Sequence, residues 1–233
     1  MSIKSKIALL SVISLVIISS VFGTMSYFRD TDVSRSTFTV GRIKLELSET
    51  NVDGKDTFGV TNNAERDSMN NYHLVPGDSY VKDPTVTVKG NSEDAFVYMT
   101  LNINNYSKLL DAFPSDRFEG MYLSTVNKII NLEAFFNLNS NDWKYCGMKV
   151  INDCAQYRFT YKSKVLKSAD DNHLGSLFTT MKIPVEADEN NLALFEDLTI
   201  DIKAYAVQAL GFEDYNEAWK VSFDEESKPF DLN

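Results

Sequence analysis

The stretch that decides the fold is Val97-Tyr98-Met99-Thr100-Leu101-Asn102-Ile103, in which an apolar side chain stands at every second position. Successive side chains of a β-strand point to opposite faces, so the odd-numbered residues of this stretch share one face. The same period of two recurs in six further segments, at residues 37–40, 43–47, 85–88, 157–161, 177–185 and 198–206. Turn signals such as Pro76-Gly77-Asp78 separate the segments. The pattern predicts a mainly β fold of about seven short strands, arranged as an antiparallel β-sandwich.

Helical signals are secondary to this strand pattern. Residues 124–136 carry apolar side chains with an approximate period of 3.6, and Ser124 is a suitable N-cap. Residues 188–197 and 212–220 each predict a further short helix. We therefore expect 105–142 to form a helical insertion between strands. Because no Pro/Gly/Ser-rich linker or internal repeat is visible, the strands are predicted to form one domain.

The composition excludes several classes of protein. The 233 residues include 23 Lys or Arg and 33 Asp or Glu, which gives a formal net charge of -10. Binding to nucleic acid needs clustered basic residues for the phosphates, and docking on an anionic membrane needs them too, so both partners are disfavoured. Hydrophobic residues make up 43% of the chain, enough to form a core and to exclude general disorder.

The N-terminus has the features of a secretory signal peptide. Two lysines precede residues 7–22, a 16-residue apolar run that only serines interrupt. This run is shorter than the roughly 20 residues of a membrane-spanning helix and suits the core of a signal peptide. Small residues follow, so we expect cleavage between Ser26 and Tyr27. Residues 1–26 would then be the signal peptide and 27–233 the mature domain, secreted from the cell. An uncleaved signal anchor is the alternative.

The two cysteines lie eight residues apart, at Cys146 and Cys154. Gly147 and Asn152-Asp153 lie between them, so a short hairpin or loop could bring the sulfurs together. Because exported proteins meet oxidising conditions, the spacing predicts a disulfide. Two buried free thiols are the alternative, and a metal pair is disfavoured because no histidine is near.

Few residues indicate an enzyme. The zinc motif His-Glu-x-x-His is absent, and His73 and His173 stand alone in polar surroundings. No Gly-x-Ser-x-Gly nucleophile elbow is present either. The sequence therefore predicts no catalytic residue, metal or cofactor. Trp143 and Trp219 could serve as carbohydrate platforms, although such residues are more often core or interface anchors.

Four segments in order resemble one known family. Gly-Thr-Met-Ser-Tyr-Phe-Arg-Asp-Thr at 23–31 looks like the signal-peptide junction of SipW-type signal peptidase substrates. Ser-Thr-Phe-Thr-Val-Gly-Arg-Ile-Lys-Leu at 36–45 and Leu-Val-Pro-Gly-Asp-Ser-Tyr-Val-Lys-Asp-Pro at 74–84 are similar to two further family elements. Ala-Tyr-Ala-Val-Gln-Ala at 204–209, followed by Ala-Trp, resembles the last strand and helix. Together they resemble the TasA/camelysin family of exported Gram-positive proteins, with 105–175 outside the resemblance.

The resemblance implies a jelly-roll β-sandwich that assembles into fibres of the biofilm matrix. In such fibres the mature N-terminal segment, here 27–40, adds as a donor strand to the sheet of the next subunit. This is physically reasonable for an extended segment freed by cleavage, since an open sheet edge accepts a strand from another chain. The partners implied are further copies of the chain, joined head to tail, the signal peptidase during export and other matrix proteins.

The residues expected to carry this assembly lie near the predicted cleavage site. Tyr27 would begin the donor strand, and the side chains of Phe28, Phe38 and Val40 would insert into the neighbouring subunit. Gly41 is the expected hinge, because the alternation changes phase there. The alternative for Phe38 and Val40 is an ordinary first strand in their own sheet.

Two other functions remain open at this stage. Camelysin is described as a surface metallopeptidase, so a peptidase is one alternative. A surface adhesion or carbohydrate-binding module is the other.

Overall fold

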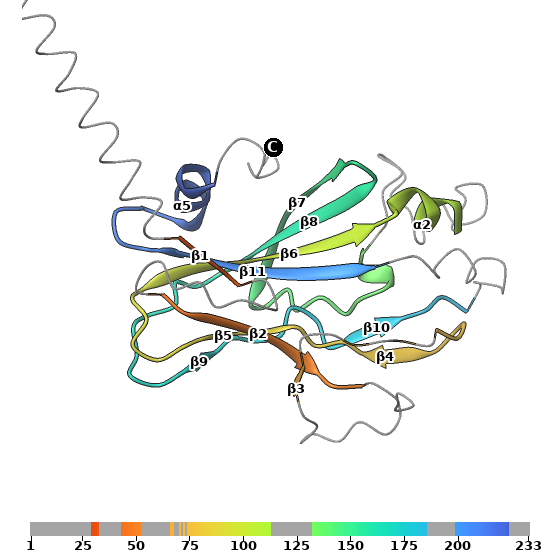
Figure 1. Ribbon diagram of the computed structural model, residues 1–233, viewed down its shortest axis with the longest axis horizontal. Coiled ribbons are helices and arrows are strands. Elements are labelled where there is room, and N and C mark those ends of the chain that lie inside the picture. The colour runs from red at the N-terminus through yellow and green to blue at the C-terminus, as the bar shows by residue number, and fades with distance from the viewer. Residues whose placement is uncertain are drawn as a thin grey trace, which may run out of the picture.

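The computed structural model describes residues 29–32, 43–52, 66–67, 70, 72, 74–112, 132–185 and 199–223. Within these ranges the protein is mainly β, with antiparallel sheets and two short α-helices (Figure 1). None of the helices in these ranges is long and apolar enough to cross a membrane.

The described strands form three antiparallel sheets. Their bounds are β1 Arg29–Asp32, β2 Leu45–Thr50, β3 Arg66–Asp67, β4 Ser79–Val81, β5 Thr85–Val88, β6 Ala95–Asn104, β7 Trp143–Ile151, β8 Cys154–Tyr161, β9 Asn172–His173, β10 Thr180–Lys182 and β11 Ile200–Gln208. A five-stranded sheet has the order β1-β11-β6-β8-β7, and a four-stranded sheet has the order β3-β2-β5-β9. Strands β10 and β4 form a pair of their own.

The alternating stretch that opens the sequence lies in β6, the middle strand of the five-stranded sheet. Its nine-residue register with β11 runs from Ile103 opposite Ile200 to Ala95 opposite Gln208. The odd-numbered residues face the main core, as predicted. The even-numbered face of β6 is buried as well, because Phe96 and Tyr98 pack in a second apolar cluster with Trp219.

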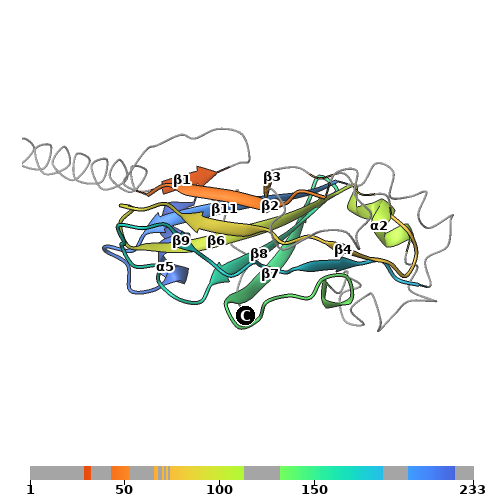
Figure 2. The ribbon, with the colours of Figure 1, turned by 90° about the horizontal axis from the view of Figure 1, so that it is seen from below.

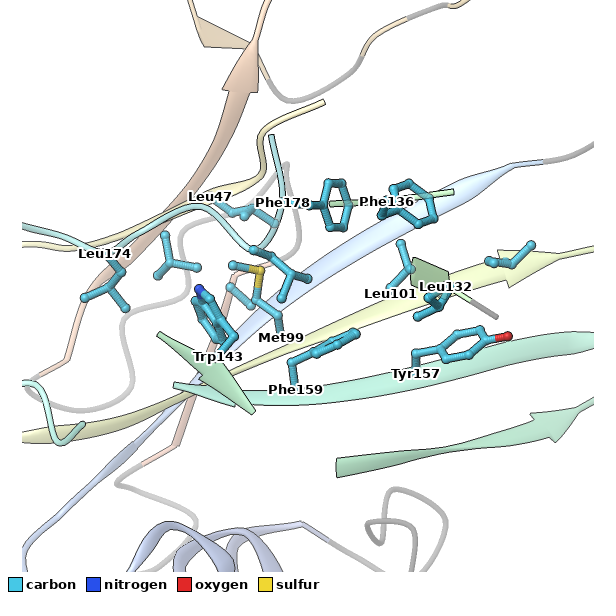
Figure 3. Packing of buried hydrophobic residues seen from close by; sticks show 14 of the residues in the cluster. Leu47, Met99, Leu101, Leu132, Phe136, Trp143, Tyr157, Phe159, Leu174 and Phe178 are labelled. Carbon is cyan, nitrogen blue, oxygen red and sulfur yellow. The ribbon is translucent and has the colours of Figure 1, made fainter. Parts of the chain in front are cut away.

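The main core lies between the five-stranded and four-stranded sheets. Leu47 of β2 packs in the same cluster as Met99 and Leu101 of β6 and Phe159 of β8 (Figure 3). Each of these side chains is buried, so the inner faces of both sheets are removed from water. The two larger sheets therefore share one hydrophobic core.

The predicted helices are partly confirmed. Helix α5, Tyr215–Ser222, corresponds to the helix expected at 212–220. Helix α2, Tyr106–Ala112, begins the expected insertion. Near the end of the insertion, the described part of the helix predicted at 124–136 is only a short 3₁₀ turn, η2, Leu132–Ala134. The rest of that helix and the one expected at 188–197 lie outside the described residues.

One strand is shorter than its alternation predicts. Residues 177–185 were expected to form one strand with the odd-numbered side chains on one face, whereas β10 has three residues. Leu177 and Phe178 are both buried, although neighbours in a strand point to opposite faces. At the other end Val185 is 69% exposed, because the strand has already ended at Lys182.

Candidate assembly edge of the five-stranded sheet

The first described segment of the chain is an edge strand. Strand β1 pairs antiparallel with β11, with Arg29 opposite Val207 and Asp32 opposite Ala204 (Figure 1). Its sequence, Arg-Asp-Thr-Asp, has three charged residues in four. Charged residues are frequent on edge strands because they discourage pairing with other chains. The pairing of β1 therefore joins a short, polar strand to the sheet.

Strand β11 supplies the edge on which β1 lies. On one side β11 pairs with β6 along all nine of its residues. On the other side β1 covers only residues 204–207. Among the described residues, Ile200 to Lys203 have no strand on that side. Within the described ranges, this half of the edge therefore has no strand partner on that side.

The two faces of β11 differ at the position of β1. Ala204 and Ala206 belong to the main core and are fully buried. Tyr205 and Val207 belong to the second apolar cluster, on the side of α5. Strand β2 of the four-stranded sheet passes close to β1 (Figure 2). The edge of β11 that β1 occupies therefore adjoins the main core on one face and the second apolar cluster on the other.

Helix α5 holds the outer face of β11 in place. Its N-cap is Asp214, whose carboxylate accepts hydrogen bonds from the backbone N–H groups of Asn216 and Glu217. Trp219 stacks on Phe223 with 3.9 Å between ring centroids and meets the ring of Tyr205 edge-on at 5.9 Å. Such aromatic contacts stabilise beyond the area that they bury. The helix therefore fixes β11 against movement on that face.

A buried cation lies under the same helix. The guanidinium of Arg158, on β8, lies 4.8 Å from the ring centroid of Trp219, a cation–π contact. Burial lowers the pKa of the Arg158 guanidinium and raises the pKa of the nearby Tyr98 hydroxyl. The hydroxyl of Tyr98 donates to the backbone carbonyl of Tyr215, 2.5 Å away. These contacts join α5 to β6 and β8, so packed side chains cover the outer face of the sheet beside β11.

The opposite edge of the sheet is β7. Among the described residues it pairs with β8 alone. Tyr145, Val150 and Ile151 are each about half exposed along it. An irregularity in the register between Tyr145 and Met148 interrupts the ladder, and Gly147 there has a φ of 113°. A bulge of this kind makes an edge less regular and less prone to pairing.

The residues that the sequence predicts to carry assembly lie outside the described ranges. This applies to Ser26 and Tyr27 at the predicted cleavage site, and to Phe28, Phe38, Val40 and Gly41. Only residues 29–32 of the predicted donor segment 27–40 are described, and they pair with β11 of their own chain. The alternation did not reveal this strand, because Arg-Asp-Thr-Asp has no apolar residue to alternate.

The predicted disulfide is wrong, although the predicted hairpin is confirmed. Cys146 and Cys154 are both free. The hairpin turns at Asn152 and Asp153, whose φ values of 51° and 59° fit a type I′ turn. This two-residue turn places Ile151 opposite Cys154. Cys146 is five residues further along β7, a distance of about 16 Å in a strand, too far for a disulfide.

The tryptophans are core residues rather than sugar platforms. Trp143 and Trp219 are each 3% exposed. The indole N–H of Trp143 donates to the carbonyl of Gly175 at 2.7 Å. The structure therefore gives no support to a carbohydrate-binding module built on these two rings.

The two histidines provide no candidate metal site in the described ranges. His173 is exposed on β9, and its Nδ1 lies 2.9 Å from the hydroxyl of Thr87. His73 lies outside the described residues. Within the described ranges, no group of three or more metal-ligating side chains comes together.

Comparisons with protein-family models, with characterised proteins and with solved structures find no match for the chain.

Proposed function

We propose that the protein is a secreted structural subunit of extracellular matrix fibres, which assembles by exchange of its N-terminal strand. The observation that carries this proposal is the position of β1. It begins three residues after the predicted cleavage site, between Ser26 and Tyr27, and it is the edge strand of the five-stranded sheet. A strand at a free chain end can leave its own sheet without unthreading any other element.

The finer fold belongs to the same proposal, a jelly-roll-like β-sandwich. Two features support it. The two larger sheets share one hydrophobic core. Strands far apart in sequence are neighbours in each sheet, such as β6 and β11, β5 and β9, and β4 and β10. In a jelly roll, the chain crosses repeatedly between the two sheets and pairs with strands from much earlier in the sequence.

On this proposal the strand that occupies the β11 edge in the monomer is replaced by the same strand of a neighbour. The contact joins two different surfaces, a donor strand and an acceptor edge, so it is heterologous and builds an open filament unless it closes. The half of the edge from Ile200 to Lys203, which has no strand on that side within the described residues, would accommodate more of the incoming segment than the four residues paired in the monomer.

The net charge sets a condition on assembly. Loss of the predicted signal peptide removes two Lys and no acidic residue, so the net charge changes from -10 to -12. Like-charged subunits repel one another at low ionic strength, and salt screens this repulsion. Filament growth should therefore be faster in moderate salt than in very dilute buffer.

Electron microscopy of the mature chain tests the proposal. We expect the 27–233 chain to form filaments, and a chain that lacks residues 27–40 to remain a folded monomer by circular dichroism and gel filtration. A synthetic 27–40 peptide added to the deleted chain should bind it, whereas a scrambled peptide of the same composition should not. Equally long filaments from the deleted chain would show that strand exchange is not the basis of assembly.

A further inference from the structure

A second feature, unrelated to the assembly edge, lies at the end of β2. Glu49 of β2 and Lys82, the residue after β4, form an ion pair with distances of 2.9 and 3.1 Å from the ammonium nitrogen Nζ to the two carboxylate oxygens. Lys82 is 6% exposed and Glu49 is 9% exposed. The ring centroid of Tyr72 lies 5.4 Å from the same nitrogen. Lys82 becomes a nucleophile only as the neutral amine, and the paired carboxylate of Glu49 is placed to take the proton that it must lose.

The side-chain amide of Asn70 lies on the other side of the same carboxylate. Its Nδ2 lies 3.4 Å from Oε2 of Glu49 and donates to the carbonyl of Thr50 at 3.0 Å. Its Oδ1 accepts the backbone N–H of Val52 at 2.8 Å. These partners identify the oxygen and the nitrogen of the amide, because the N–H of Val52 can only donate and the carbonyl of Thr50 can only accept.

The arrangement has the components of an acyl transfer. Oε2 of Glu49 is within 2.9 Å of the amine nitrogen of Lys82 and 3.4 Å of the amide nitrogen of Asn70. A carboxylate so placed can take a proton from one nitrogen and deliver it to the other. The N–H of Val52 points at the carbonyl oxygen of the amide, where negative charge would develop during attack.

We propose that Lys82 and Asn70 form an intramolecular isopeptide bond, with Glu49 as the proton-transfer group. The amine nitrogen attacks Cγ of Asn70 and a bond forms between Nζ and Cγ. The bond between Cγ and Nδ2 breaks, and the amide nitrogen leaves as ammonia. Lys82 gives up two protons in total. One passes through Glu49 to the departing nitrogen, and the other goes to solvent or to the ammonia. The reaction needs no oxidant or other reagent.

A purely structural role for the three residues is the competing explanation. The neighbouring ion pair of Arg66 with Asp83 has such a structural role, because the guanidinium of Arg66 on β3 donates to both the carboxylate and the backbone carbonyl of Asp83, which follows β4. It is more exposed, with 38% of the Arg66 side chain accessible, and its carboxylate also accepts from the backbone N–H and the hydroxyl of Thr50. The Lys82 group differs in being buried and in having a side-chain amide, that of Asn70, on the same carboxylate oxygen as the Lys82 nitrogen.

The intact mass of the purified mature chain tests the proposal directly. We expect the chain to be lighter than its sequence by the mass of one ammonia, and proteolysis to give one branched peptide that joins Lys82 to Asn70. The variant Lys82→Arg keeps the positive charge, and Glu49→Gln keeps the shape of the side chain. Both variants should have the full mass calculated from their sequences, because neither can complete the reaction. Circular dichroism of both variants establishes that they are folded.

Two results would overturn the proposal. A wild-type chain of full sequence mass, unchanged after prolonged incubation, would show that the group is only a buried ion pair with an amide partner. A mass deficit of one water, mapped to a bond between Lys82 and Glu49, would show that the carboxylate is the acceptor and that Asn70 has no chemical role. The wild-type measurement decides between these outcomes even if a variant fails to fold.

Discussion

Locking β1 to its own sheet should stop fibre assembly. Arg29 and Val207 are directly opposite in the antiparallel register, so their Cα atoms are about 4.5 to 5.5 Å apart, inside the range for a disulfide. The double variant Arg29→Cys with Val207→Cys, made in a chain whose two native cysteines are replaced by Ser, should therefore form an internal disulfide. Val207 is buried, and cysteine is close to valine in size, so the sheet should tolerate the change.

The size of the effect follows from the weakness of the free strand. Four register pairs in an antiparallel ladder give about four hydrogen bonds, each worth about 1 kcal/mol net. Ordering four residues costs about 1–2 kcal/mol each, or about 4–8 kcal/mol in total. The ordering cost equals or exceeds the hydrogen-bond gain, so the unlocked strand should be released readily in the monomer. The disulfide removes the released state altogether.

The assay compares filament formation with and without reductant. Under oxidising conditions the locked chain should remain monomeric in light scattering and microscopy, and reductant should restore assembly to the level of the parent chain. The matched control is Arg29→Cys with Ala204→Cys, which are three positions out of register, about 10 Å apart, and cannot bond. Long filaments from the oxidised locked chain, with the disulfide verified by mass, would refute the exchange of β1.

Two further predictions concern stability. Trp219→Ala should lower the free energy of unfolding in urea by about 3–5 kcal/mol, because it removes the ring stacked on Phe223. Leu210→Ala, at a residue that is 78% exposed, should change it by less than about 0.5 kcal/mol, and equal effects would contradict the packing of α5. The backbone N–H of Lys167 holds the pKa of the Asp94 carboxyl below its usual range. Its carboxylate therefore stabilises the fold above the ordinary Asp pKa, and this contribution is lost as the pH falls through the lowered value. Asp94→Asn should lower the melting temperature slightly at neutral pH but not in acid, and a deficit that persists in acid would contradict this.

The parts of the fold that depend on local pattern were predictable. The alternation at 97–103 and 157–161 identified β6 and β8, and the run at 198–206 identified β11. In each of these strands, one face packs into a continuous core, so the apolar period directly reflects burial. Helix α5 was also predicted, and its cap Asp214 accepts two backbone N–H groups as helix starts require.

The parts that depend on pairing partners were not predictable in the same way. Strand β1 has no apolar period, and it is a strand because the edge of β11 offers unpaired backbone groups. The disulfide was a different kind of error. The turn at Asn152 and Asp153 was visible in the sequence, and a two-residue turn fixes Ile151 opposite Cys154. The spacing of eight residues could therefore have excluded the bond, had the register of the hairpin been worked out.

The charge of β1 connects the fold to the proposed assembly. A strand that must leave one sheet and enter another has to bind its own sheet weakly and avoid unrelated edges. Arg-Asp-Thr-Asp meets both needs, since it is short and its charges oppose indiscriminate pairing. Specificity must then come from the acceptor, where α5 fixes one face of β11 and the core fixes the other. If this reasoning is right, replacing the charged residues of β1 with valine should strengthen the monomeric pairing, because valine favours β-structure, and should therefore slow exchange.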